Sequence, residues 1–180
     1  MKKNSAPFIV FAWRLIALHT ISYFAVGMLA LYALDYRDLF ATGALEGFMR
    51  PTDDPVTALG PGLQFIRGLI FAIVLWPFRK TFLEGNFGWF RLWLLFVGLG
   101  ILATFGPAPG SVDGMIYTQI PWYQQFIFLP ELLLQSLLLS IFLFIWYKKS
   151  HVAWDIVAAI LMSLVMLMSA AGYLFLSQNP

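Results

Sequence analysis

Two apolar stretches of this chain each contain a pair of polar residues, and the two residues of each pair are one helical turn apart. His19 and Tyr23 lie in the first apolar stretch, and Glu131 and Gln135 lie in the fourth. Residues four apart share one face of a helix, so each pair predicts a polar stripe on an apolar helix. An imidazole facing a carboxylate in a partly dry cavity would suit a path for protons or a small solute. Alternatively, the side chains of the two stripes would form hydrogen bonds between helices, and each such bond contributes about 0.6 kcal/mol to stability.

Four charged residues also fall within apolar stretches, where a central charge costs about 2.5 to 3.5 kcal/mol on insertion scales. Arg14 and Asp155 each lie one to two turns from the same end of the predicted bundle, and Arg67 and Glu131 lie near the opposite end. Arg14 could therefore pair with Asp155, and Arg67 with Glu131. Such pairs would either fix helix register or contribute to a polar lining, unless the arginines extend to lipid headgroups.

Three aspartates outside the apolar stretches are weak candidates for a divalent-cation site. Asp53 and Asp54 are adjacent, and Asp113 lies in a later loop. Carboxylate oxygens are the ligands that Ca²⁺ and Mg²⁺ prefer, but adjacent aspartates beside prolines are more typical of a solvated turn. The chain has no cysteine, which excludes thiolate metal sites and thiol nucleophiles. No familiar catalytic motif is present, and we expect no cofactor.

The elements that must position these residues are predicted by composition. Hydrophobic residues make up 61% of the 180-residue chain and charged residues only 11%, against about 25% charged in soluble domains. A span of about 20 apolar residues crosses a bilayer. The chain is therefore predicted to be a single all-α membrane domain, residues 1–180, with about five transmembrane helices. Their expected ranges are residues 8–34, 62–78, 89–105, 125–147 and 152–176.

The distribution of basic residues predicts the orientation, because short cytoplasmic loops are enriched in Lys and Arg. One set of predicted ends carries seven basic residues, whereas the other is mostly acidic. The basic residues are Lys2, Lys3, Arg79, Lys80, Arg91, Lys148 and Lys149. Five spans place all of them on one side. We expect a multi-pass protein of the cytoplasmic membrane, with its N-terminus in the cytoplasm and its C-terminus outside.

The two outer loops are expected at residues 35–61 and 106–124. The first is long enough for a short interfacial helix around residues 39–49. The second mixes Gly and Pro with apolar residues, which suggests a segment that lies in the interface or folds back over the bundle. The second and third spans are short, so a four-span arrangement is the main alternative.

Composition narrows the function only to broad classes. A net charge of +2 gives no electrostatic reason to expect nucleic-acid binding. The leading hypothesis is a non-enzymatic accessory or interaction subunit, embedded in the lipid bilayer and contacting partner membrane subunits or further copies of itself. The first alternative is a small proton-coupled transporter or channel lined by His19, Tyr23, Glu131 and Gln135, with Arg67 as counter-charge. A third is a membrane enzyme acting on lipid at the outer interface among Asp53, Asp113, Tyr117 and Glu131.

Overall fold

The protein is a bundle of helices in a computed structural model that describes residues 7–102 and 108–178. Every regular element in these two ranges is helical, as the composition predicted. The long helices are α1 (Phe8–Ala33), α3 (Pro55–Leu75), α5 (Gly88–Leu102), α8 (Leu129–Lys148) and α9 (Val152–Gln178). The short elements are α2 (Tyr36–Ala41), η1 (Gly43–Leu45), α4 (Arg79–Leu83), α6 (Val112–Tyr117), α7 (Trp122–Gln125) and η2 (Phe126–Phe128).

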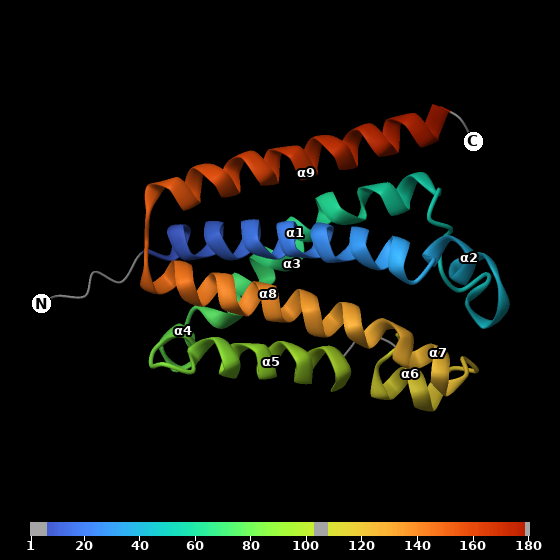
Figure 1. Cartoon of the computed structure of the whole chain (residues 1–180), viewed down its shortest axis with the longest axis horizontal. Coiled ribbons are helices and arrows are strands. Elements are labelled where there is room, and N and C mark those ends of the chain that lie inside the picture. The colour runs from blue at the N-terminus through green and yellow to red at the C-terminus, as the bar shows by residue number, and fades with distance from the viewer. Residues whose placement is uncertain (1–6, 103–107, 179–180) are drawn as a thin grey trace, which may run out of the picture.

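The five long helices run alternately between two ends of the bundle (Figure 1). α1 lies between α8 and α9, α3 crosses obliquely behind α1, and α5 lies against the outer side of α8. Because α1 packs against α3, α8 and α9, it is the central helix and carries the most buried polar side chains. These are Arg14, His19, Thr20 and Ser22.

Four of the helices are long and apolar enough to cross a membrane: α1, α3, α9 and the continuous segment Trp122–Lys148 that contains α8. This is the architecture of a helical integral membrane protein. The fifth, α5, has 15 residues, which gives a length of about 22 Å against a hydrocarbon core of about 30 Å. The span predicted for residues 89–105 extends to residues 103–105, which lie outside the described part of the chain.

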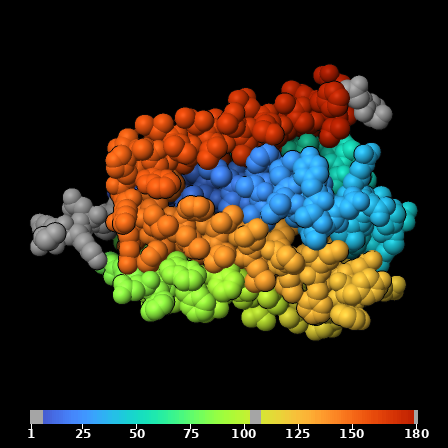
Figure 2. All heavy atoms as spheres, in the orientation of Figure 1, coloured from blue at the N-terminus to red at the C-terminus, as the bar shows by residue number. Residues whose placement is uncertain are grey.

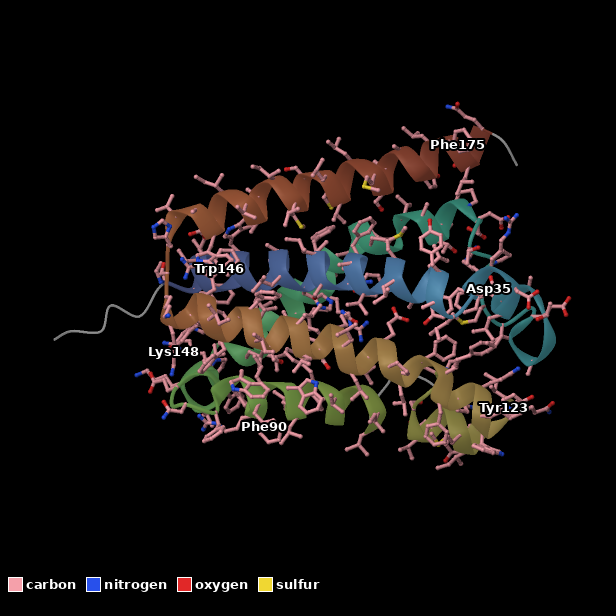
Figure 3. All side chains as sticks on the ribbon, in the orientation of Figure 1. Asp35, Phe90, Tyr123, Trp146, Lys148 and Phe175 are labelled. Atoms are coloured by element: carbon pink, nitrogen blue, oxygen red, sulfur yellow. The ribbon has the colours of Figure 1, made fainter. Side chains whose placement is uncertain are left out.

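The charges separate between the two ends. The end formed by α4 and the α8–α9 connection holds Arg79, Lys80, Lys148 and Lys149, and we call it the basic end. The opposite end is formed by α2, η1, α6 and α7, which build a cap over the bundle, and we call it the acidic end. Figure 3 shows Lys148 at the first and Asp35 and Tyr123 at the second. The acidic residues of this end are Asp35, Asp38, Glu46, Asp53, Asp54 and Asp113.

The largest difference from the sequence prediction is the start of α3. It was expected at residue 62, after Pro61, but α3 begins at Pro55 and Pro61 lies inside it. Proline lacks an N–H group and disturbs the helical hydrogen bonds around it. The disturbance is stabilised from α9: Ser169 Oγ donates to the Ala58 carbonyl at 2.6 Å and accepts from the Gly62 N–H at 3.2 Å. A hydroxyl inserted in this way allows a break in a helix buried in lipid.

The start of α3 is fixed by its N-terminal residues. Asp54 is the N-cap, its Oδ1 accepts from the Val56 N–H at 2.7 Å, and Pro55 takes the first helical position. Both features favour a helix start. The first outer loop is correspondingly shorter than predicted. Its helical parts are Tyr36–Ala41 and Gly43–Leu45 rather than residues 39–49.

Candidate functional site

Glu131 lies in the first turn of α8, beneath the cap at the acidic end. Its Oε2 accepts a hydrogen bond from the Tyr36 hydroxyl of α2. Its Oε1 lies 3.8 Å from the position that a Cβ on Gly27 would occupy. Because Gly27 of α1 has no side chain, the carboxylate can approach the α1 backbone closely. No lysine, arginine or histidine of the described residues forms a salt bridge with Glu131.

Tyr36 is held rigidly by its neighbours. It is buried and stacks on Phe40 with ring centroids 4.8 Å apart and planes 22° from parallel. Phe128 packs against the same ring at 5.8 Å. Burial raises the pKa of the Tyr36 phenol, and the hydrogen bond to Glu131 raises it further. The phenol therefore stays protonated and remains a donor to the carboxylate at physiological pH.

A cavity of about 620 Å³ opens beside this pair. It lies between α1, α3, α8 and α9, and the segment that joins α2 to α3 forms part of its wall. Its lining is mostly aromatic, aliphatic and methionine side chains. The lining residues are Tyr23, Phe24, Gly27, Met28, Leu31, Tyr36, Phe40, Met49, Arg50, Thr52, Thr57, Ala58, Pro61, Phe128, Glu131, Met168 and Ser169.

Charge within this cavity is restricted to two residues. Glu131 lies on the α8 wall, and Arg50 lies in the α2–α3 segment. The Arg50 guanidinium is exposed and donates to Asp54 Oδ2 at 2.9 Å, so its charge is already paired. Glu131 Oε1 accepts no hydrogen bond from the described residues, so this oxygen is open to a ligand that enters the cavity.

His19 does not line the cavity and does not face α8. Its Nε2 lies 3.2 Å from Gln64 Oε1 of α3, and its ring packs edge-on against Phe71 with centroids 5.0 Å apart. Its Nδ1 has no hydrogen-bond partner among the described residues. One residue of each predicted stripe reaches the cavity, since Tyr23 and Glu131 both line it, whereas His19 and Gln135 do not. The centroid of the Tyr23 ring is 6.5 Å from that of the His19 ring.

Two other residues predicted for the lining lie apart from it. Arg67 is exposed on α3, and its guanidinium carbon is 5.7 Å from the centre of the Phe71 ring. It forms no salt bridge within the described part of the chain, so the predicted pairing with Glu131 is wrong. Gln135 is half-buried on α8, forms no hydrogen bond with another described residue and does not line the cavity.

Arg14 and Asp155, by contrast, are brought together at the basic end. Arg14 Nη2 lies 3.3 Å from Asp155 Oδ2, and the same nitrogen donates to Ser150 Oγ at 2.7 Å. The guanidinium also lies 5.1 Å from the centre of the Trp146 ring. These contacts join α1 to the end of α8 and the start of α9. They are far from the cavity at the other end.

A residue that the sequence prediction missed holds the second outer loop in place. Gln125 is fully buried in α7, where its Oε1 accepts from the Gly110 N–H at 2.8 Å. Its Nε2 lies 3.0 Å from the Gly114 carbonyl and 2.9 Å from Thr118 Oγ1. A glutamine beside a Gly-rich loop is the only sequence signal of this role. These bonds tie residues 110–118 of the loop to the start of the segment that leads into α8.

The three aspartates considered for a metal site are not gathered into one. No group of three or more His, Cys, Asp or Glu residues that could hold a metal ion occurs in residues 7–102 and 108–178. Asp54 instead caps α3. Tyr117, considered for a lipid-directed enzyme, is 74% exposed and lines a separate pocket with Phe48. Asp53, Asp113 and Tyr117 are all absent from the lining around Glu131.

Comparison with known proteins offers no relative from which a role for this site could be transferred. No protein-family model, no curated protein and no solved structure matches the chain.

Proposed function

We propose that this protein is a non-enzymatic multi-pass protein of the cytoplasmic membrane that binds an amphipathic small molecule in the cavity beside Glu131. The observation that carries the proposal is the combination of an apolar lining with one carboxylate oxygen that has no partner among the described residues. Ligand sites are mostly apolar, with a few polar groups that fix orientation. A carboxylate accepts hydrogen bonds, so the complementary headgroup is a hydroxyl or an amine.

The proposed pose follows from the lining. The polar group of the ligand donates to Glu131 Oε1, next to Gly27, while its apolar part packs against Phe24, Met28 and Met168. Tyr36 keeps the other carboxylate oxygen engaged, so the carboxylate plane is fixed before a ligand arrives. A fixed acceptor loses less entropy on binding than a mobile one.

The orientation is part of the proposal. The basic end faces the cytoplasm, because Lys and Arg are retained there during insertion. The N-terminus is then cytoplasmic and the C-terminus external, and the cavity lies in the outer half of the membrane. Partner membrane subunits or a homo-oligomer remain compatible with this role, since a binding subunit of this size can pass its ligand to another protein.

Binding can be measured with three fluorescent probes that share one alkyl chain and end in an amine, an alcohol or a carboxylate. The purified protein should bind the amine and the alcohol at least tenfold more tightly than the carboxylate. Glu131→Gln should remove the preference for the amine, whereas Met28→Trp, which fills the cavity, should weaken binding of all three. Glu46→Gln, an exposed acidic residue of the same cap, is the matched control. Equal binding of the three probes by the wild-type protein and Glu131→Gln would contradict the proposal.

A second candidate function is proton-coupled movement of a solute. It is favoured by Tyr23, which links the cavity to His19, and by the buried His19 Nδ1 and Thr20 Oγ1, which have no partners among the described residues. Buried polar atoms without partners are costly, and ionisable residues such as histidine within membrane helices mark ion pathways and proton relays. The interior of proteoliposomes loaded with a pH-sensitive dye would acidify when a proton gradient is imposed across their membrane. His19→Gln would slow this acidification at least tenfold. No acidification above that of empty liposomes would exclude proton conduction.

A further inference from the structure

An apolar groove separate from the cavity runs along the bundle in the half nearer the basic end. Its volume is about 280 Å³. α1 forms its floor, and α8 and α9 form its two walls. Figure 2 shows α1 as a strip between the two walls. The lining residues are Leu18, Ile21, Phe142, Ile145, Trp146, Trp154, Val157, Ala158 and Leu161.

The groove exists because α8 and α9 are held apart. The two helices are joined by the short connection at residues 149–151, yet α1 lies between them. Arg14 of α1 fixes this arrangement by binding Ser150, the Trp146 carbonyl and Asp155. Deeper in the bundle, the small residues Ala17 and Ala158 pack with Trp146, so the floor stays close to the walls.

The material that fills this groove must be apolar. All nine lining side chains are hydrophobic, and several are largely exposed, including Trp154 at 47% and Val157 at 51%. If this groove were empty, the side chains along its whole lining would lose dispersion contacts. In a bilayer an acyl chain is the available apolar filling. Trp154 lies in the first turn of α9, toward the basic end, and exposed indole rings favour the headgroup region of a bilayer.

Two lysines, Lys148 and Lys149, lie in the sequence between Trp146 and Trp154, which both line the groove. Asp155, a carboxylate close to the groove, is paired with Arg14. Lys148 is turned away, since its Nζ donates to the Gly85 carbonyl at 2.8 Å and lies over Phe144. Lys149 follows it in the α8–α9 connection, is exposed and forms no salt bridge within the described residues. Its charge is complementary to a lipid phosphate, and each such residue near an anionic membrane surface contributes about 1 kcal/mol.

We propose that this groove is a binding site for one anionic phospholipid, with an acyl chain between α8 and α9 and the headgroup phosphate at Lys149. Trp154 flanks the glycerol region, and Val157 and Leu161 contact the chain farther in. The bound lipid fills the space that Arg14 holds open and so completes the packing of α9. This site is independent of the cavity at the acidic end.

The test is native mass spectrometry of the protein released from nanodiscs that contain equal amounts of phosphatidylglycerol and phosphatidylcholine. The wild-type protein should retain one phosphatidylglycerol, at least fivefold over phosphatidylcholine. Val157→Trp fills the groove and should abolish retention of both lipids. Ile160→Trp makes the same change at a position of α9 that is similarly exposed but outside the lining, and it should retain the lipid.

The charge contribution is tested in the same experiment. Lys149→Glu should remove the preference for phosphatidylglycerol while the protein remains folded, because this side chain is exposed. Lys80→Glu makes the same charge change elsewhere at the basic end and should leave the preference intact. Equal retention of the two lipids by the wild-type protein, retention unchanged in Val157→Trp, or a dimer in place of bound lipid would each overturn the proposal.

Discussion

Arg14 of α1 and Asp155 of α9 form an ion pair with an Nη2–Oδ2 distance of 3.3 Å. The side chain of Arg14 is 9% exposed and that of Asp155 is 34% exposed, so the pair lies partly out of solvent. The same guanidinium reaches Ser150 and Trp146. One side chain of α1 therefore contacts both α8 and α9 at the point where these two helices separate.

A double-mutant cycle should measure this pair. Arg14→Ala leaves a partly buried carboxylate without its cation, and we expect a loss of about 1 to 3 kcal/mol in the free energy of unfolding, below the value for fully buried pairs. Asp155→Ala should cost less, because Arg14 keeps its other contacts. The double variant should cost less than the sum of the two. Unfolding followed by tryptophan fluorescence in detergent provides the values, and strict additivity would contradict direct coupling.

The path of the chain across the membrane can be tested by thiol labelling, because the natural sequence contains no cysteine. We expect single cysteines at Gln119 and Asp113, both at the acidic end, to react with a membrane-impermeant maleimide in intact cells. Cysteines at Asn86 and Lys149, at the basic end, should react only after lysis. If α5 does not cross the membrane, Asn86 and Asp113 will label from the same side.

The second outer loop should not accept a side chain at Gly114. A Cβ there would collide with the Ala108 carbonyl oxygen and lie 3.2 Å from Gln125 Oε1. Gly114→Ala should therefore detach this loop, and limited proteolysis should cut between residues 108 and 121 at least fivefold faster. Gly98→Ala on α5 is the control, since a Cβ there meets nothing within 4 Å and alanine favours helix over glycine. Equal cleavage of the two variants would contradict the packing described for the loop.

The start of α3 should be sensitive to acid. The Val56 N–H, followed by the Arg50 side chain, lowers the pKa of the Asp54 carboxyl below its usual range. The folded state then binds this proton less readily than the unfolded state. Its stabilisation is present above the usual aspartate pKa of about 3.9 and is lost as the pH falls through the lower pKa of the folded state. Asp54→Asn should show a smaller decrease in Tm between pH 5 and pH 3 than the wild-type protein, whereas Asp53→Asn should match the wild type.

Some contacts between residues could be predicted from the sequence and others could not, and the difference has a physical reason. The helical class and the separation of charge between two ends follow from composition and charge distribution along the chain. Arg14 and Asp155 lie at similar distances along their helices from the basic end, and this similarity was enough to suggest that they are close together. Arg67 and Glu131 also have similar depths, but their contact depends on the rotation of α3 about its axis. That rotation is set by packing against α1 and α9, which no local pattern encodes.

The candidate cavity was less accessible to prediction than the helices. Glu131 was identified as a polar intramembrane residue, but its partner Tyr36 belongs to a short helix in the first outer loop. That helix was placed three residues too late, because Asp35 adopts a left-handed conformation with φ of 46° and starts a new helix directly after α1. Pro61 was treated as the last residue of the preceding loop, since the compensating Ser169 lies more than 100 residues later.

The hydroxyl that Ser169 inserts into α3 also sets an order of assembly. Gly62 and Ser169 are 107 residues apart, so at about 5 to 20 residues per second the ribosome needs about 5 to 20 s to make the intervening chain. During that interval the disturbed turn at Pro61 lacks its partner and must be hydrated or held by another protein. A chain truncated before residue 165 should therefore be degraded faster in pulse-chase experiments than one truncated after residue 175. We therefore expect α3 to reach its final form only after α9 has been synthesised.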